Sequence, residues 1–227
     1  MTPSKILIAG ASGNIGRACM EFFPAQGREV IGVSRKGPSI YHVDLAAPTQ
    51  VSELVARLPP FDLVVMAHGT QQPHELEAPN FIDTYWSIIR DNLHSAVYLT
   101  HFLLSQNKLN EGALIVYCSS IHAMQPRQGR APYAIAKAGL EALARSAAIE
   151  GAALGIRAIA LRLGQMDKAM KGISFTPEQF REITDKLLTA PVTCEEVAKF
   201  ILTLYDMKGM NGVVFDYNSG HHLSIWP

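Results

Sequence analysis

Residues 5–16 read KILIAGASGNIG, an apolar run followed by three glycines in the spacing GxxGxxG. The run from Lys5 to Ala9 is short, apolar and closed by glycine, which predicts a buried strand. Residues 14–26 then place apolar side chains on one side of a helix, and Gly27 ends that helix. A strand, a glycine-rich turn and a helix in this order indicate the start of an α/β domain.

The rest of the chain alternates between the same two patterns. Further strands are expected at 29–34, 39–43, 62–67, 113–118, 156–163 and 212–216, and helices at 49–58, 80–106, 132–154, 177–188 and 193–207. The predicted strands are apolar on both faces, which is typical of a parallel sheet with helices covering each side. We therefore expect residues 1–227 to form one doubly wound, Rossmann-type α/β domain around a seven-stranded parallel sheet.

Composition narrows the choice of partner and compartment. Hydrophobic residues make up 48% of the 227 residues and charged residues 18%, with 20 basic and 20 acidic side chains. Because the chain has no basic tract, we expect no nucleic acid or membrane surface as a partner. Three widely spaced cysteines, no signal-peptide pattern and no long apolar stretch predict a cytoplasmic protein with reduced thiols.

The glycine-rich turn lies where folds of this kind bind the pyrophosphate of a dinucleotide. Backbone N–H groups and the helix N-terminus attract phosphates, and a side chain at the closest glycines would block them. The spacing alone is a weak signal because tight turns also need glycine, but its place between a strand and a helix favours a cofactor. The residues expected to hold the cofactor here are Gly10, Ser12, Gly13, Asn14, Ile15 and Gly16.

The end of the second predicted strand discriminates between cofactors. An acid about 20 residues beyond the glycines would bind a ribose 2′-hydroxyl and repel a 2′-phosphate. This chain has Ser34-Arg35-Lys36 instead, and the planar fork of Arg35 could bind a 2′-phosphate. The alternative is a solvated arginine in a turn. We expect NADP(H) to be preferred over NAD(H), with Ser34 and Arg35 in contact with it.

Tyr133 and Lys137 stand four residues apart on a predicted helix and therefore share a face. An ammonium group beside a phenol stabilises the phenolate and lowers the pKa of the tyrosine. Such a tyrosine could donate a proton to a carbonyl oxygen or take one from an alcohol. Ser120 ends the fifth predicted strand, on the edge of the sheet that borders the ligand crevice, where its hydroxyl could bind the substrate oxygen.

Ser119-Ser120 followed by Tyr133-Ala134-Ile135-Ala136-Lys137 resembles the signature of the short-chain dehydrogenase/reductase family. The resemblance covers nearly the whole chain, including a last strand at 211–216. It implies a fourth catalytic residue at Asn92, which would hold a water in a proton relay with Lys137. It also implies cofactor contacts from Asp44, Leu45, Ala67, Gly69, Tyr133 and Lys137.

Several positions depart from the family pattern. Met66-Ala67-His68-Gly69 replaces an asparagine-rich sequence, Leu163-Gly164 replaces a proline-glycine pair, and Lys168 stands where a threonine is common. Asn14 replaces the central glycine of the turn, with Gly13 beside it as compensation. The second and third strands are so close in sequence that a crossover helix is expected to be missing. These changes leave the catalytic prediction intact and weaken inferences about cofactor and substrate.

Substrate contacts are expected from residues that follow the strand ends. Ser120, His122, Gln165 and Met166 are assigned to the substrate pocket, with loop packing as the alternative for the last three. Residues 168–190 correspond, by resemblance, to the family's substrate-covering segment. His68 is interpreted as a turn residue. His221-His222 has no third ligand at a convincing spacing, so no metal is expected.

These residues predict an oxidoreductase that transfers a hydride between NADP(H) and a carbonyl or alcohol, with Tyr133 as the general acid/base. Two alternatives stay open: a non-catalytic nucleotide-binding regulatory protein, and an epimerase or dehydratase of the family's extended branch. By resemblance, the two long helices at 80–106 and 132–154 are expected to form the interface of a homodimer or homotetramer.

Overall fold

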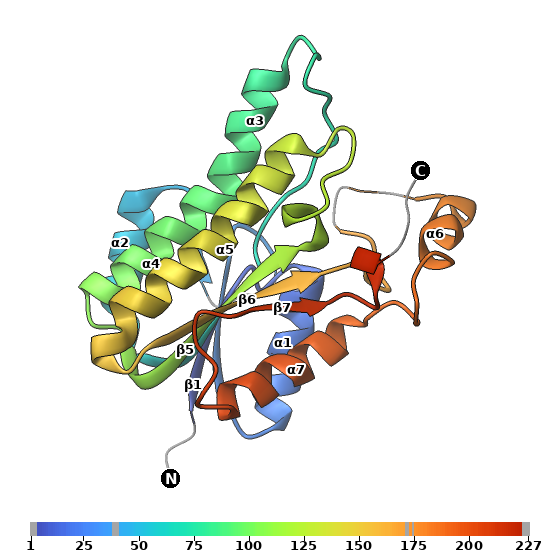
Figure 1. The fold of residues 1–227 in the computed structure, drawn as a ribbon. Helices are drawn as coiled ribbons and strands as arrows, with labels where there is room; N and C mark the ends of the chain where they lie inside the picture. Colours follow the sequence, from blue (N-terminus) through green and yellow to red (C-terminus); the bar gives the residue numbers. More distant parts are fainter. Residues whose placement is uncertain (1–3, 38–40, 171–172, 174, 224–227) are drawn as a thin grey trace.

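Seven parallel strands form one sheet, in the order β3-β2-β1-β4-β5-β6-β7, in the described part of the chain (Figure 1). The computed structural model describes residues 4–37, 41–170, 173 and 175–223. Every strand pair in it is parallel. The strands are β1 (Lys5–Ala9), β2 (Glu29–Ser34), β3 (Tyr41–His42), β4 (Phe61–Met66), β5 (Leu109–Ser120), β6 (Arg157–Leu163) and β7 (Val214–Tyr217). The predicted seven-stranded parallel sheet of a doubly wound α/β fold is confirmed.

Helices cover both faces of the sheet, with α2, α4 and α5 on one face and α1 and α7 on the other (Figure 1). The helices are α1 (Asn14–Ala25), α2 (Pro48–Arg57), α3 (Phe81–Ile89), α4 (Ser95–Ser105), α5 (Ala131–Gly151), α6 (Pro177–Thr184) and α7 (Cys194–Asp206). Among the described residues, no helix combines the length and the apolar character that a membrane span requires.

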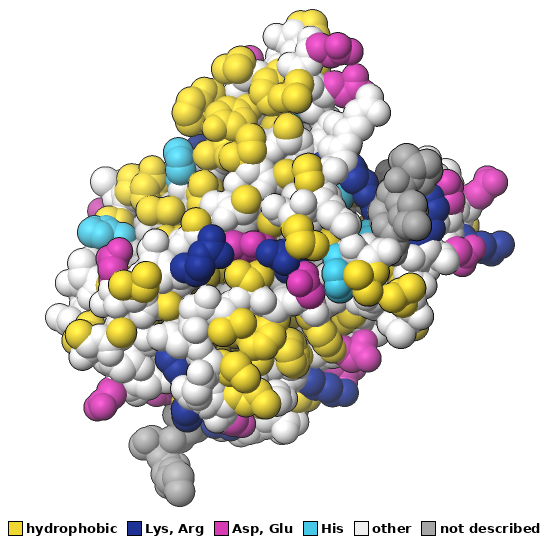
Figure 2. Space-filling model, viewed as in Figure 1, with side chains coloured by type: hydrophobic (Ala, Val, Ile, Leu, Met, Phe, Trp, Pro, Cys, Tyr) yellow, Lys and Arg dark blue, Asp and Glu magenta, His cyan; other side chains and the backbone are white. Residues whose placement is uncertain are grey.

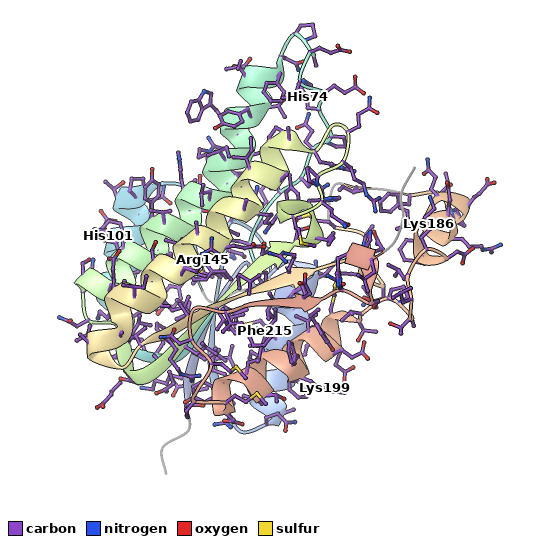
Figure 3. The ribbon with its side chains drawn as sticks, viewed as in Figure 1. His74, His101, Arg145, Lys186, Lys199 and Phe215 are labelled. Atoms are coloured by element: carbon purple, nitrogen blue, oxygen red, sulfur yellow. The ribbon has the colours of Figure 1, made fainter. Side chains whose placement is uncertain are left out.

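Alternate residues of each strand point into two separate apolar cores. In β1, Leu7 and Ala9 point toward the face covered by α2, α4 and α5, whereas Ile6 and Ile8 point toward α1 and α7. Phe215 of β7 lies on the α7 side (Figure 3), where its ring centre is 6.1 Å from that of Phe200. Because both faces are buried, the strands need apolar residues at successive positions, which is the pattern seen in the sequence.

The region predicted as one helix at 80–106 is interrupted. α3 ends at Ile89, Arg90–His94 forms a π-helical turn, and α4 begins at Ser95. Such turns widen a helix by one residue and are common at functional sites. The π turn contains Asn92, so the departure from a regular helix falls on a residue predicted to be catalytic.

Smaller differences concern element ends. Within the described residues β3 covers only Tyr41–His42, and residues 39 and 40 of the predicted strand lie outside them. β2 ends at Ser34, which leaves too few residues for a crossover helix before β3, as expected from the sequence. β5 begins at Leu109 rather than at residue 113, and α6 ends at Thr184 rather than at residue 188.

The order of the strands predicts a crevice at the carboxyl ends of β1 and β4. β1 lies between β2 and β4, so the chain leaves it toward one edge of the sheet and later returns to its other side. Ligands of open α/β sheets bind at the carboxyl ends of the strands at such a switch point. The glycine-rich turn follows β1, and residues 67–69 follow β4, so both sequences border this crevice.

Candidate active site

The glycine-rich turn packs closely against the loop that follows β4. Gly10 has a φ of +89°, and a Cβ on it would come within 2.6 Å of the backbone of His68. A Cβ on Gly16 would collide with the carbonyl group of Gly10. Gly16 is buried and lines neither cavity described below, and its closest contacts pack α1 against the turn that follows β1.

Two cavities meet in the crevice. The Arg35 cavity, of about 550 Å³, and the Tyr133 cavity, of about 250 Å³, share Gly13, Ala67, His68 and Gly69. Among the residues predicted to hold the cofactor, the Arg35 cavity contains Gly10, Ser12, Gly13, Ser34, Arg35, Asp44, Leu45, Ala67 and Gly69. The Tyr133 cavity contains Gly13, Asn14, Ile15, Ala67, Gly69, Tyr133 and Lys137. The shared residues join the two cavities into one elongated site.

The joined site offers backbone donors that could hold the phosphates of a dinucleotide. α1 begins at Asn14, next to both cavities, and no described side chain caps its N-terminus or places an acid in its first turn. Its first backbone N–H groups are therefore free to bind an anion such as a pyrophosphate. Gly10 allows the turn to lie directly against the backbone of the loop after β4, with which a Cβ would collide. The residues present fit a nicotinamide dinucleotide.

Arg35 lies in the Arg35 cavity but is already paired. Its Nη1 atom lies 3.0 Å from Oδ2 of Asp91, and Asp91 also pairs with Arg90 at 3.0 Å. About half of the Arg35 side chain is exposed, at 49%. A 2′-phosphate at Arg35 would therefore have to share the guanidinium with the carboxylate of Asp91 or displace that carboxylate. Asp91 at this position was not predicted from the sequence.

Ser120, Tyr133 and Lys137 converge on the Tyr133 cavity. Ser120 is the last residue of β5, Tyr133 lies in the first turn of α5, and Lys137 follows one turn later. The Ser120 hydroxyl forms a side-chain hydrogen bond with Tyr133. Nζ of Lys137 donates to the carbonyl oxygen of Cys118 at 2.7 Å and lies 5.4 Å from the centre of the Tyr133 ring. The fold thus brings the three predicted residues together.

Burial dominates the acidity of both groups. It raises the pKa of Tyr133 to about 12, although the hydrogen bond with Ser120 acts in the opposite direction. It also lowers the pKa of Lys137 to about 8. The sequence-based expectation of a lowered pKa for Tyr133 is wrong for the protein without a bound cofactor. Burial destabilises the phenolate more than the neighbouring groups stabilise it.

Asn92 lies behind the cavities rather than in their walls. Its Nδ2 atom donates to the carbonyl oxygens of Thr70 and Ile88, each at 2.9 Å, while its buried Oδ1 has no hydrogen-bond partner among the described residues. A Cβ on Gly69 would strike Oδ1 and would come within 3.6 Å of Nζ of Lys137. Oδ1 of Asn92 and Nζ of Lys137 therefore face the same small space beside Gly69. This position would let Asn92 influence Lys137 without lining either cavity.

His68 lies where the two cavities join, so it is more than a turn residue. Its Nε2 contacts the Ser95 hydroxyl at 2.8 Å, and that hydroxyl donates to the carbonyl oxygen of Asp91 at 2.9 Å. Its buried Nδ1 has no partner among the described residues. Burial, followed by the charges of Lys137 and Arg35, lowers the pKa of His68 to about 3, so the ring is neutral at physiological pH.

The predicted substrate residues line the Tyr133 cavity, together with others that sequence reasoning missed. Ser120, His122, Gln165 and Met166 all lie in its wall, and the His122 ring centre is 6.1 Å from that of Tyr133. The missed residues are Gln71, Arg127, Arg130 and His221. The available signal was two arginines, three residues apart, in the short loop between Ser120 and Tyr133.

His221 belongs to this wall. Its Nδ1 accepts from the backbone N–H of Gln165 at 3.1 Å, and its Nε2 lies 2.6 Å from Nη2 of Arg127. His222 instead contacts Oδ1 of Asn218 at 2.9 Å. In the described residues, no group of three or more His, Cys, Asp or Glu side chains could hold a metal ion.

The segment at 168–190 contributes one wall of the Tyr133 cavity. Met170, Ile173, Phe175 and Ile183 line it, while residues 171, 172 and 174 lie outside the described residues. The Nδ2 atom of Asn14 donates to the carbonyl oxygen of Ala169 at 2.8 Å. The residue that replaces a family glycine in the turn therefore ties the turn to this segment.

Solved structures share the fold throughout. The structure of a blue fluorescent protein from a metagenomic library, in complex with NADPH, superposes with a TM-score of 0.84 at 21% identity, covering 96% of this chain and 97% of that one. At this identity the likeness concerns the fold alone. It agrees with the doubly wound sheet.

Sequence comparisons identify the family. Residues 10–222 match the family model described as Enoyl-(Acyl carrier protein) reductase. An uncharacterised oxidoreductase of Bacillus subtilis is 26% identical over 95% of this chain and 98% of its own length. The 3-oxoacyl-(acyl-carrier-protein) reductase of Escherichia coli is 30% identical over 66% of this chain and 68% of its own length. The chain belongs to the short-chain dehydrogenase/reductase family of oxidoreductases.

Proposed function

We propose that this chain is an NADP(H)-dependent reductase or dehydrogenase that interconverts a carbonyl compound and its alcohol, with Tyr133 as the general acid/base. One observation carries the proposal: Ser120, Tyr133 and Lys137 meet in a cavity that joins the glycine-rich turn at His68 and Gly69. A nicotinamide bound in this site would supply or accept the hydride. The small volume of the cavity favours a small-molecule substrate.

The side chains of the cavity have distinct tasks in this proposal. Tyr133 is protonated at neutral pH, since its pKa is about 12, and can donate to a carbonyl oxygen. Ser120, already hydrogen-bonded with Tyr133, holds the same oxygen as charge develops on it. The ammonium of Lys137 stabilises the phenolate that remains. Asn92 faces the space next to Nζ of Lys137, so together they can return a proton to Tyr133 through water.

The preference for NADP(H) rests on Arg35. The Arg35 cavity contains Ser34, Arg35 and Lys36 at the end of β2, and no acid stands at that strand end. A guanidinium binds a phosphate through two parallel hydrogen bonds. The structural relative whose description includes NADPH supports the same cofactor class.

The test is turnover by the purified protein. We expect NADPH oxidation with a panel of ketones, aldehydes, oxo acids and 3-oxoacyl thioesters, the last chosen for the name of the E. coli relative. Tyr133→Phe is expected to lose most of this turnover while binding NADPH as the wild type does. If no carbonyl or alcohol is turned over although NADPH binds, the protein is a nucleotide-binding regulator rather than an enzyme.

We also propose a homodimer or homotetramer built through α3, α4 and α5. Figure 2 shows apolar side chains gathered over the upper part of the molecule, where α3 lies. Large apolar side chains on these helices are exposed: Ile82 by 62%, Trp86 by 56% and Ile149 by 78%. Large contiguous apolar patches mark sites of contact with other proteins, which supports an interface on this face.

A further inference from the structure

A charged network lies behind the candidate active site, on the face of the sheet that α5 covers. Ser119 of β5, Arg162 of β6 and Asp216 of β7 are paired in register, so their side chains form a row across three strands. Glu141 of α5 lies over this row and is buried. Glu141 and Arg162 line neither of the two cavities, so they can act on the proposed reaction only through residues that do.

Arg162 binds both oxygens of the Glu141 carboxylate. Its Nε lies 3.0 Å from Oε1 and its Nη2 lies 2.8 Å from Oε2, the two-point geometry of strong arginine–carboxylate pairs. Nη1 donates to both oxygens of Asp216, each at 3.2 Å, and lies 3.5 Å from the sulfur of Met124. The hydrogen bonds to Glu141 raise the pKa of Arg162, although burial acts in the opposite direction. The guanidinium is therefore permanently charged, and all three of its nitrogens have partners.

The same carboxylate lies one helical turn from the lysine of the candidate active site. Lys137 and Glu141 are four residues apart on α5, so they share a face. The Ser119 hydroxyl contacts both, at 2.8 Å from Oε1 of Glu141 and 3.2 Å from the carbonyl oxygen of Lys137. Both residues are buried, and a buried carboxylate and a buried ammonium gain most by pairing with each other.

Lys137 nevertheless directs its ammonium elsewhere. Its Nζ donates to the carbonyl oxygen of Cys118 at 2.7 Å and lies 5.4 Å from the centre of the Tyr133 ring. Although Lys137 and Glu141 both lie in the described part of the chain, no ion pair joins them, whereas the guanidinium of Arg162 occupies both carboxylate oxygens. Arg162 thus takes the partner that would otherwise compete for the ammonium.

We propose, resting on the function proposed above, that Arg162 is a positioning residue that holds the carboxylate of Glu141 away from Lys137, so that the ammonium stays beside the phenol. Without Arg162 the buried carboxylate would keep only the Ser119 hydroxyl as a partner, which is strongly unfavourable. A pair with Lys137 would relieve this cost and would withdraw the ammonium from the phenol. The arrangement therefore protects the proposed proton relay from a neighbour on its own helix.

Titratable groups reach Lys137 from three elements of the described chain. Tyr133 lies on the same helix, Cys118 belongs to β5, and His68 follows β4 and has its pKa lowered by burial and by the Lys137 charge. The other cation four residues from the carboxylate is Arg145, one turn further along α5. Arg145 is exposed (Figure 3), so a pair formed there in water would gain little.

The kinetic test compares Arg162→Gln, Glu141→Gln and the double variant Glu141→Gln/Arg162→Gln with the wild type, using any carbonyl that the wild type reduces with NADPH. We expect Arg162→Gln to lower kcat roughly tenfold or more, because the electrostatic stabilisation of the phenolate is lost. Glu141→Gln removes the competing carboxylate and should keep kcat within about twofold, and the double variant should recover most of the loss. Arg145→Gln is the matched control and should follow the wild type.

A purely structural clamp gives a different pattern. If the network served only to fix α5 on the sheet, Glu141→Gln would lose as much activity as Arg162→Gln, and the double variant would recover nothing. That pattern overturns the proposal. Wild-type kcat in Arg162→Gln overturns it as well, because it would show that the released carboxylate turns to Arg145 or to water instead.

A spectroscopic readout does not depend on turnover. In protein isotope-labelled at the lysine Cε atoms, the NMR signal missing from Lys137→Met belongs to Lys137, and its pH titration can be followed. The midpoint should lie at about 8 in the wild type, move toward 10.5 in Arg162→Gln as the carboxylate approaches, and return to about 8 in the double variant. Equal midpoints in the wild type and Arg162→Gln contradict the proposal. If the midpoints move as expected but no carbonyl is turned over, the positioning of Lys137 stands and the proposed function fails.

Arg162→Lys keeps the test decisive if Arg162→Gln does not fold. A lysine retains the positive charge but lacks the planar fork that binds two carboxylate oxygens and Asp216 at once. We expect Arg162→Lys to raise the Lys137 midpoint above that of the wild type, and Glu141→Gln/Arg162→Lys to restore it. An unchanged midpoint in Arg162→Lys would overturn the proposal.

Discussion

The ammonium nitrogen of Lys137 lies 5.4 Å from the centre of the Tyr133 ring, and both residues are buried. Burial works in opposite directions on the two groups, since it raises the pKa of the phenol and lowers that of the ammonium. At neutral pH the protein therefore carries a protonated phenol beside a partly titrating ammonium. This pairing suits donation of a proton to a carbonyl better than removal of one from an alcohol.

The first prediction concerns the pH profile of the reduction. The pKa of Lys137 is lowered to about 8, so its charge is present below that pH and lost above it, whereas Tyr133 stays protonated to about 12. We expect kcat/KM for NADPH, which reports groups of the free enzyme, to be level below about pH 8 and to fall above it. A profile that stays level to about pH 10 would show that Lys137 keeps its usual pKa.

Lys137 also links stability to pH. Its folded pKa, about 8, lies below its ordinary value of 10.5, so between these values the unfolded chain binds more protons and the free energy of unfolding rises with pH. The complete rise is of the order of 3 kcal/mol. Urea unfolding from about pH 7.5 to about pH 9.5 should show roughly 2 kcal/mol of this rise in the wild type and none of it in Lys137→Met. The same change in the free energy of unfolding with pH in both proteins would show that Lys137 is not the group responsible.

His68 has the opposite effect on the acid side. Its folded pKa is about 3 against an ordinary 6.5, so the unfolded chain binds the proton first and stability is lost as the pH falls below about 6.5. Lowering the pH to about 5.5 should cost the wild type roughly 1 kcal/mol more than it costs His68→Asn. His101→Asn, on an exposed histidine of α4 (Figure 3), is the matched control and should follow the wild type.

Arg35 should determine the choice between NADPH and NADH. Arg35→Ala is expected to weaken NADPH binding roughly tenfold or more, as the loss of a charged hydrogen-bond pair does, and to leave NADH binding nearly unchanged. Asp91→Asn removes the carboxylate now paired with Arg35 and should strengthen NADPH binding a few-fold. Fluorescence titration of both cofactors measures each effect. An equal loss for both cofactors in Arg35→Ala would assign Arg35 to the structure of the loop.

The exposed apolar side chains of α3 and α5 predict how charged substitutions change the oligomeric state. Trp86→Glu on α3 and Ile149→Glu on α5 each place a charge on a surface that the proposed assembly buries. Light scattering coupled to gel filtration should show a smaller assembly for at least one variant, with thermal unfolding of the monomer little changed. An unaltered mass for both variants, equal to that of the wild type, would place the interface elsewhere.

The sequence predicted the fold because the fold depends on patterns that run over many residues. Apolar strands separated by helical stretches indicate a parallel sheet. The glycines after β1 indicate the edge of the sheet where a ligand crevice is expected. Ser120, Tyr133 and Lys137 could be grouped in advance because two share a helix face and the third ends the strand before it. Element ends were less predictable, and the π turn at Asn92 leaves no periodic signal.

Residues assembled by loops were beyond sequence reasoning. Arg127 and Arg130 stand in a loop without a periodic pattern, and only the folded chain brings them into the same cavity as Tyr133. The pairing of Arg35 with Asp91 joins positions 56 residues apart, and no local pattern announces it. The raised pKa of Tyr133 was missed for a related reason: the neighbouring lysine can be seen in the sequence, but the loss of water around both groups cannot.

The hydrogen bond from Asn14 to the carbonyl oxygen of Ala169 joins the first turn of α1 to the residue between Lys168 and Met170, both of which line the Tyr133 cavity. In the proposed enzyme the nucleotide would lie on one side of this bond and the substrate on the other. A single contact would then couple the two binding events. We expect an ordered reaction in which the nucleotide binds before the substrate and leaves after the product.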